Sequence, residues 1–149
     1  KPYHRALRRL LTSAHRDFGA AILVDCHSMP SSAGNKEERP RADVVLGDRY
    51  GTSCVAAVSE TVESTLRELG YVVSRNKPYA GGFITEHYGN PAAGLHSIQV
   101  EVNRALYMDE RSYQRSQHFA SLARDIEALA DRLAQLPIEE LRPYRAAAE

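Results

Sequence analysis

Residues 22–30, which read Ile-Leu-Val-Asp-Cys-His-Ser-Met-Pro, constrain the fold of this chain more than any other stretch. In them a short apolar segment, typical of a strand, is followed directly by side chains that can bind metals or exchange protons. Because side chains alternate along a strand, Asp25 and His27 are predicted to share one face. Open α/β sheets bind ligands at the carboxyl ends of their strands, where His27 is expected. The alternative interpretation, that His27 is only a polar residue at the start of a loop, stays open at this point.

Strand-like and helical patterns alternate along the rest of the chain. Strands are predicted at residues 20–26, 42–46, 71–74 and 96–103, and amphipathic helices at residues 3–18, 52–69 and 119–136. Residues 77–94 are predicted to form a long loop, and loops of that length are usually functional or mobile. This order favours a three-layer α/β/α domain with a mixed, largely parallel sheet. A chain of 149 residues with 43% hydrophobic content is expected to form a single domain.

Composition excludes several classes of partner. Nineteen basic residues balance nineteen acidic ones, so no overall field attracts nucleic acid or an anionic surface. No apolar run approaches the length of a membrane span. The two cysteines, Cys26 and Cys54, are interpreted as buried thiols of a protein in the reducing cytoplasm. We therefore expect a cytoplasmic protein that acts on a small molecule.

Polar residues cluster at the predicted strand ends and in the adjoining loops. The groups are Asp25 with His27, Arg41 with Asp43, Asp48 with Arg49, and Glu101 with Asn103 and Arg104. A carboxylate such as Glu101, which emerges from an apolar strand, has its pKa raised by burial unless it is paired. A raised pKa suits a general acid or base. A structural ion pair between Glu101 and an arginine is an equally open alternative.

Four segments of this chain form an ordered set of motifs: Asp-Cys-His-Ser-Met-Pro at 25–30, Arg-Ala-Asp-Val-Val-Leu-Gly-Asp at 41–48, Gly-Gly-Phe-Ile-Thr at 81–85 and Gln-Val-Glu-Val-Asn-Arg-Ala-Leu-Tyr-Met-Asp-Glu at 99–110. Together, and in this order, they resemble the N-formylglutamate amidohydrolase family. The resemblance implies a zinc carboxypeptidase-like fold. It also implies an activity in which a zinc-bound water attacks a formyl amide and releases formate and glutamate.

The same resemblance implies roles for individual residues. His27 matches the histidine that binds zinc, and Glu101 matches the carboxylate that takes a proton from the zinc-bound water. Zinc lowers the pKa of bound water from about 15.7 to about 7, so a nearby carboxylate can accept that proton. Asp25 and Asn103 are expected to orient these groups without touching the metal. For Asp25, a simple role as a hydrogen-bond acceptor at the strand end is equally open.

A dicarboxylate substrate requires cations, and arginine can bind a carboxylate through two parallel hydrogen bonds. Arg41 and Arg104 lie inside the matching segments, and Arg49 lies shortly before a predicted helix start, where backbone amides also attract anions. These three arginines are the predicted substrate-binding residues, with surface salt bridges as the alternative for each. Gly81 and Gly82 would allow the backbone to approach a ligand closely, although an ordinary turn explains them equally well.

The implied zinc site is incomplete in this chain. The family pattern takes two more ligands, a histidine and a glutamate, from a region upstream of His27, and no such His-x-x-Glu pair precedes it. The chain is therefore expected to be the C-terminal part of a longer amidohydrolase. Two functions stay open: a zinc-dependent amidohydrolase, or a non-catalytic relative that keeps the fold and binds a small anionic ligand.

Overall fold

A four-stranded sheet organises the chain in the computed structural model, which describes residues 1–31 and 42–143. Its strands are β1 (Ala21–Met29), β2 (Val44–Gly47), β3 (Val73–Arg75) and β4 (Leu95–Asn103), arranged in the order β1-β4-β2-β3. β1 pairs with β4 in parallel, β2 pairs with β4 in antiparallel fashion, and β3 is parallel to β2. The sheet is therefore mixed, with mostly parallel pairings, as predicted.

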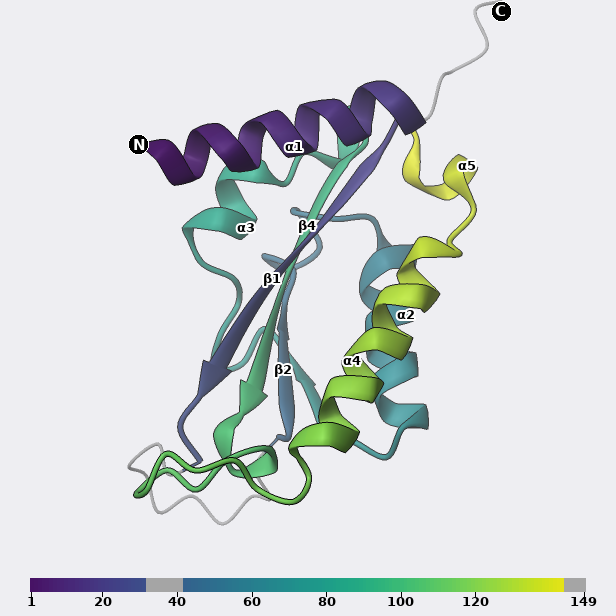
Figure 1. Cartoon of the computed structure of the whole chain (residues 1–149). Helices are drawn as coiled ribbons and strands as arrows, with labels where there is room; N and C mark the ends of the chain where they lie inside the picture. Colours follow the sequence, from purple (N-terminus) through teal and green to yellow (C-terminus); the bar gives the residue numbers. More distant parts are fainter. Residues whose placement is uncertain (32–41, 144–149) are drawn as a thin grey trace, which may run out of the picture.

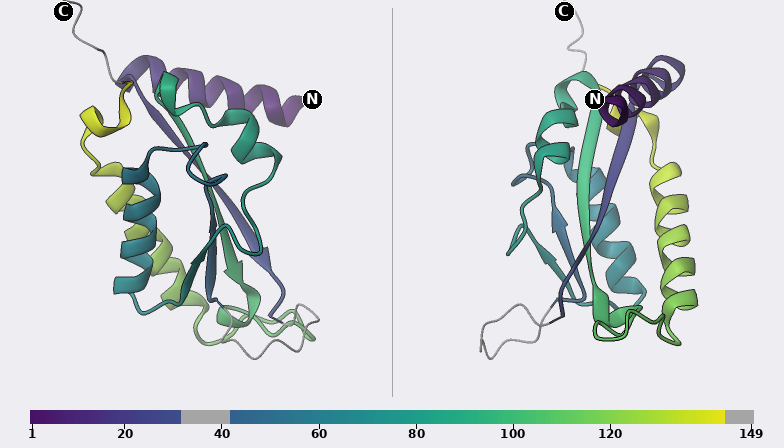
Figure 2. Two further views of the ribbon diagram at one scale, coloured as in Figure 1. Left: turned by 180° about the vertical axis from the view of Figure 1, so that it is seen from behind. Right: turned by 60° about the vertical axis from the view of Figure 1, so that its left-hand side comes forward.

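Helices flank this sheet on both sides. The helices are α1 (Pro2–Phe18), α2 (Ala56–Glu68), α3 (Phe83–Tyr88), α4 (Phe119–Ala134) and α5 (Ile138–Leu141), with short 3₁₀ turns η1 (Pro91–Ala93) and η2 (Arg104–Leu106). Figure 2 shows α2 and α4 together on one side of the sheet and α3 on the other. Helix α1 crosses the end of the sheet where β1 begins (Figure 1). The predicted α/β class is confirmed.

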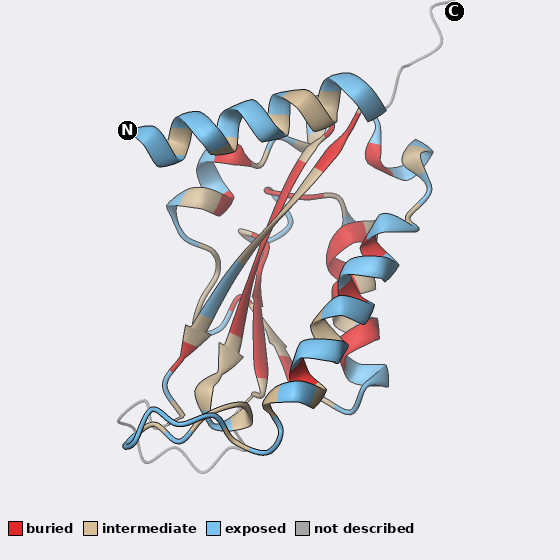
Figure 3. Cartoon of the chain, in the orientation of Figure 1, coloured by how far each residue is buried: buried red, intermediate tan, exposed pale blue. Residues whose placement is uncertain are grey.

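The core lies between the sheet and the pair α2 and α4. It is made of fully or nearly fully buried aliphatic side chains: Val44, Leu46, Val58, Val62, Leu66, Ile98, Val100, Leu129 and Leu133. Figure 3 shows buried segments along the central strands and on the helices beside them. Each such side chain contributes about 1.5–3 kcal/mol when it is removed from water. Because Ile98 and Val100 point into this core, alternation directs the intervening Gln99 and the following Glu101 to the opposite face.

Three features of the strands and helices differ from the predictions. β1 continues to Met29, where it pairs with Asn103, so His27 lies inside a strand and not at the start of a loop. The predicted loop at 77–94 contains α3, whose six residues are too few to show a helical repeat in the sequence. The second helix begins at Ala56, four residues later than predicted.

Helix α1 is amphipathic, as predicted, although none of its residues is buried, and Tyr3, Leu10 and Phe18 are all more than 60% exposed. One expectation about burial was wrong. The Cys26 thiol belongs to an exposed residue of the edge strand β1, whereas Cys54 is buried as expected. None of the described helices combines the length and apolarity needed to cross a membrane.

Candidate active site

Of the site residues predicted from the sequence, Asp25, His27, Glu101 and Arg104 lie together where β1 and β4 run side by side. In this parallel ladder Asp25 is the register partner of Gln99, and His27 is the register partner of Glu101. Neighbouring strands lie about 4.8 Å apart, and side chains at paired positions point to the same face. The structure therefore places an imidazole next to a carboxylate near the carboxyl ends of two parallel strands.

His27 is oriented by Asp25. The His27 Nε2 atom lies 3.1 Å from Asp25 Oδ2, and the Asp25 side chain is mostly buried while that of His27 is half exposed. An ionised carboxylate only accepts hydrogen bonds, so Nε2 carries the proton and the lone pair of the neutral imidazole lies on Nδ1. A carboxylate that accepts from the other ring nitrogen is typical of histidines that bind metals. Nδ1 is thus the atom available to a metal or a proton.

Glu101 is a buried carboxylate, with 9% of its surface exposed. Burial raises its pKa above the ordinary glutamate value. The neighbouring His27 and Arg104 oppose this rise, while the negative charge of Asp25 adds to it. A carboxyl group with a raised pKa exchanges protons more readily near neutral pH than an exposed one. The local chemistry therefore suits proton transfer.

Gln99 connects Glu101 to a neighbouring loop. Its Nε2 atom donates to Glu101 Oε1 at 2.9 Å, and its Oε1 atom accepts from the backbone N–H of Gly82 at 2.8 Å. Alternation along β4 puts Gln99 on the same strand face as Glu101, but no function was predicted for it. The signal that could have identified it was this shared face together with burial, since a buried amide needs partners.

The loop that carries Gly81 and Gly82 borders this polar face because Gly47 has no side chain. A Cβ atom at Gly47 would lie 2.4 Å from the Gly81 nitrogen, which no real structure tolerates. Gly81 itself has φ +107°, in the region that favours glycine. The loop is also held by Arg49, whose backbone N–H donates to the carbonyl of Ala80 at 2.8 Å. Gly47 therefore allows the loop to come close, and Gly81 supplies the positive φ of its turn.

Arg104 lies beside the pair, and Arg49 lies farther along the sheet. The Nε atom of Arg104 donates to Ser28 Oγ at 3.2 Å, and its Nη2 atom donates to the Ser28 carbonyl at 3.3 Å. Arg49 pairs with Glu86 of α3 at 3.3 Å. Because α2 begins only at Ala56, Arg49 does not stand next to a helix N-terminus as expected. Arg41 falls outside the described residues.

Asn103 interacts with its own backbone in this structure. Its Oδ1 atom accepts from the N–H of Ala105 at 3.1 Å and so caps the short turn η2. Asn103 pairs with Met29, two positions beyond the His27 and Glu101 pair. Its observed contact is therefore a local turn, next to the paired residues.

The residues in the described ranges do not complete a metal site. Among residues 1–31 and 42–143, no group of three or more His, Cys, Asp or Glu side chains is placed to hold a metal ion. The other histidines of the N-terminal region have structural partners: His4 Nδ1 contacts the Tyr88 hydroxyl, and His15 Nε2 contacts the carbonyl of Ala93. His27 with Asp25 supplies one oriented imidazole, which is too few donors for a zinc site.

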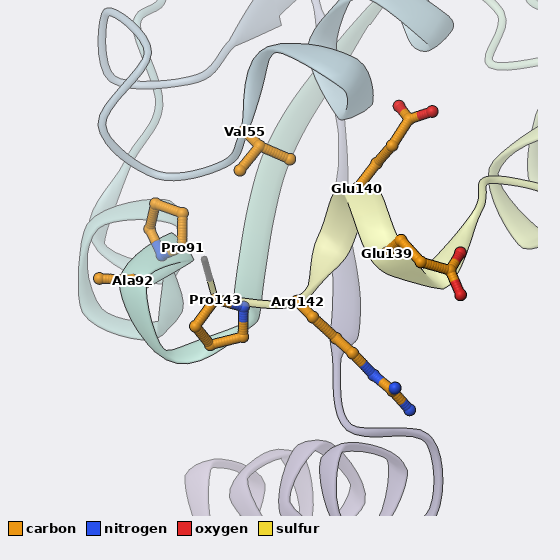
Figure 4. A pocket seen from close by; sticks show the side chains of 7 residues that line it. All are labelled: Val55, Pro91, Ala92, Glu139, Glu140, Arg142 and Pro143. Atoms are coloured by element: carbon orange, nitrogen blue, oxygen red, sulfur yellow. The ribbon is translucent and has the colours of Figure 1, made fainter. Parts of the chain in front are cut away.

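A separate pocket lies at the other end of β4, beside the residues that precede it. It is lined by Val55, Pro91, Ala92, Glu139, Glu140, Arg142 and Pro143 (Figure 4). Pro91 and Ala92 come just before β4 begins at Leu95, whereas Glu101 lies near the end of that strand. This pocket contains neither His27 nor Glu101, so we do not assign the active site to it.

Comparisons with known proteins agree on one family. The sequence profile of the family described as N-formylglutamate amidohydrolase matches residues 1–108. Two proteins named N-formylglutamate deformylase are similar: the Pseudomonas putida protein is 37% identical over 111 residues, and the Pseudomonas aeruginosa protein is 35% identical over 112 residues. Each alignment covers 74% of this chain and 42% of the relative.

Solved structures extend the agreement to the fold. The crystal structure of N-formylglutamate amidohydrolase from Ralstonia eutropha is 43% identical, with a TM-score of 0.85 over 90% of this chain and 49% of that chain. A gene product of Agrobacterium tumefaciens, 15% identical with a TM-score of 0.60 over 91% of this chain and 50% of its own, shares the fold alone. The chain thus spans about half the length of the relatives it matches.

Proposed function

The chain belongs to the N-formylglutamate amidohydrolase family, and we propose that it supplies the proton-transfer carboxylate and one metal ligand of an enzyme that hydrolyses N-formyl-L-glutamate. The observation that carries this proposal is the pairing of His27 with the buried Glu101 on adjacent strands. The names of the Pseudomonas relatives support the substrate and the reaction. The products would be formate and L-glutamate.

In the proposed reaction Glu101 handles the proton. It takes a proton from a water molecule as the water oxygen bonds to the formyl carbon. It then gives that proton to the amide nitrogen as the carbon–nitrogen bond breaks. The other proton of the water stays on the released formic acid, which loses it to the amine or to solvent, so the products leave as formate and the free amino acid, and Glu101 is again ionised. Its burial supports this role, because a raised pKa brings the carboxyl group closer to working pH.

His27 is proposed as one ligand of a zinc ion. Its Nδ1 lone pair faces away from the hydrogen bond with Asp25, and such a carboxylate holds a metal-binding imidazole in the correct tautomer. Catalytic zinc sites take three protein ligands, so the described residues alone do not fit a zinc ion. We propose that the remaining ligands come from the half of the family's length that this chain does not span.

The arginines are proposed to bind the two carboxylates of the substrate. Arg104 is the strongest candidate, because it lies next to Ser28 and influences the pKa of Glu101. Arg49 and Arg41 remain proposals from their positions in the family segments. A hydrogen bond to a charged group contributes about 1.5–3 kcal/mol, so each such contact would favour an acidic substrate about ten- to a hundredfold over a neutral one.

The test measures formate release in a full-length enzyme, meaning these 149 residues joined to the half of the family's length that they do not span. Zinc-loaded enzyme should release formate from N-formyl-L-glutamate at least about tenfold faster, by kcat/KM, than from N-formyl-L-methionine. The 149-residue chain alone should hold substoichiometric zinc and show negligible turnover. Saturable binding of N-formyl-L-glutamate without formate release by the full-length enzyme would contradict the proposal and favour the non-catalytic alternative.

A further inference from the structure

We propose that Gln99 is a positioning residue for Glu101, because its amide bridges the Glu101 carboxylate and the backbone of the glycine loop. This inference rests on the proposed function, since it assumes that Glu101 moves the proton. The bridge consists of two hydrogen bonds, from Gly82 N–H to Gln99 Oε1 and from Gln99 Nε2 to Glu101 Oε1. No family resemblance assigned Gln99 a role.

The chemistry of the partners fixes the orientation of the Gln99 amide. A backbone N–H can only donate, so the Gln99 oxygen must face Gly82. The amide nitrogen then necessarily faces Glu101, to which it donates. Turning the amide over would place two donors against each other at Gly82 and two acceptors against each other at Glu101. Gly82 therefore determines which group of Gln99 meets the carboxylate.

Burial makes this arrangement rigid. Gln99 is only 5% exposed, so water cannot readily replace either partner. The loop end of the bridge is itself held: the Gly82 carbonyl accepts from the N–H of Glu86 at 3.1 Å, and the Ala80 carbonyl accepts from the N–H of Arg49. The missing side chain of Gly47 lets the loop come close enough to reach Gln99.

The bridge separates the two oxygens of Glu101. Oε1 is occupied by the Gln99 amide, whereas Oε2 accepts no hydrogen bond from any residue in the ranges 1–31 and 42–143. Oε2 is thus the oxygen left to exchange a proton with water. Placement errors of about 1 Å in a catalytic group can cost about a hundredfold in rate, so fixing this carboxylate has a kinetic consequence.

Two substitutions separate the positioning of Glu101 from simple anchoring of the loop. Gln99→Met keeps the length of the side chain but removes both hydrogen bonds. Gln99→Glu keeps an acceptor for Gly82 N–H but has no amide donor for Glu101. Gln135→Met makes the same chemical change at the exposed residue that follows α4, and it serves as the control.

Amide hydrogen exchange at Gly82, followed by NMR in the 149-residue chain, tests the loop side of the bridge. Exchange should accelerate in Gln99→Met and stay close to that of the parent in Gln99→Glu and in the control. An unchanged Gly82 exchange rate in Gln99→Met would overturn the bridge, whatever the activity of the enzyme.

Kinetics in the full-length enzyme test the Glu101 side. Both Gln99 variants should lower kcat for formate release about 10- to 100-fold, with KM within about twofold of the parent, and the control should match the parent. Gln99→Glu puts a second carboxyl group in place of the amide donor at Glu101, so a parental kcat in that variant, as in Gln99→Met, would overturn the proposal. An inactive parent would instead show that the proposed function is wrong, and Gly82 exchange would then decide the bridge alone.

Discussion

His27 and Glu101 occupy one rung of the parallel β1–β4 ladder, although they lie far apart in the sequence. This register brings the imidazole, held by Asp25, next to a buried carboxylate, held by Gln99. Each of the two functional groups thus has its own partner two residues earlier on the same strand face. The arrangement places the proposed metal ligand and the proposed base side by side.

Gly47→Ala should disturb the site through the glycine loop. The new Cβ atom would lie 2.4 Å from the Gly81 nitrogen, so the loop must move away from Gln99. We expect a loss of about 1–3 kcal/mol in the free energy of unfolding, measured by urea denaturation, together with a lower kcat. Gly51→Ala is the control: it strains a backbone at φ +81° in open space, so it should lose stability but keep its kcat.

Arg104→Lys should weaken substrate binding in the full-length enzyme. Lysine offers one point charge where the guanidinium group holds Ser28 through two nitrogens and can meet a carboxylate with two parallel bonds. KM for N-formyl-L-glutamate should rise about tenfold or more. The exposed Arg124→Lys on α4 should leave KM unchanged. Equal KM values in the two variants would reassign Arg104 to a structural role.

Acid should destabilise the chain through His96. This side chain is 1% exposed, its Nε2 atom contacts the Leu141 carbonyl at 2.8 Å, and burial lowers its pKa below the ordinary value of 6.5. Below pH 6.5 the unfolded chain binds a proton that the folded chain does not. The contribution of His96 to stability is therefore complete above pH 6.5 and declines as the pH falls from there toward the folded-state pKa.

Urea unfolding between pH 7.5 and pH 5 measures this effect. One such group changes the free energy of unfolding by at most about 1.4 kcal/mol per pH unit. His96→Gln should be less stable than the parent at pH 7.5 but should lose less stability on acidification. Parallel pH profiles for the two proteins would show that His96 does not carry the dependence.

Alternation in the sequence was enough to predict which residues share the site face. The strand patterns around Asp25 and Glu101 placed both side chains, and His27, opposite the apolar core, and the structure agrees. Periodicity could not predict the Gln99 bridge, because that contact depends on a loop whose approach is allowed by a missing side chain at Gly47. A sequence pattern predicts which residues share one face of a helix or strand. Tertiary packing determines which backbone segment contacts that face.

The same limit applies to α1. Its apolar stripe was correctly identified, but a stripe does not specify what covers it, and in this structure Leu10 and Phe18 remain exposed. For His27 the face was predicted correctly, but the end of its strand was not. The end of β1 was predicted three residues too early, because pairing with β4 continues through Ser28 and Met29.

His27→Ala should remove zinc from the full-length enzyme. If Nδ1 of His27 is a ligand, elemental analysis should show a clear loss of bound zinc, whereas the exposed His118→Ala should keep the parental content. Asp25→Asn should weaken zinc binding about 10- to 100-fold, because it changes the partner that orients the imidazole. Full zinc occupancy in His27→Ala would place the metal elsewhere.

The rate of formate release by Glu101→Gln in the full-length enzyme tests the central claim most directly. The substitution keeps the shape of the side chain but removes the base. We therefore predict a kcat about 10²- to 10⁴-fold below the parent, with unchanged zinc content by elemental analysis and an unchanged fold by circular dichroism. A Glu101→Gln enzyme that keeps its zinc and releases formate at the parental rate would contradict the assignment of Glu101 as the proton-transfer group.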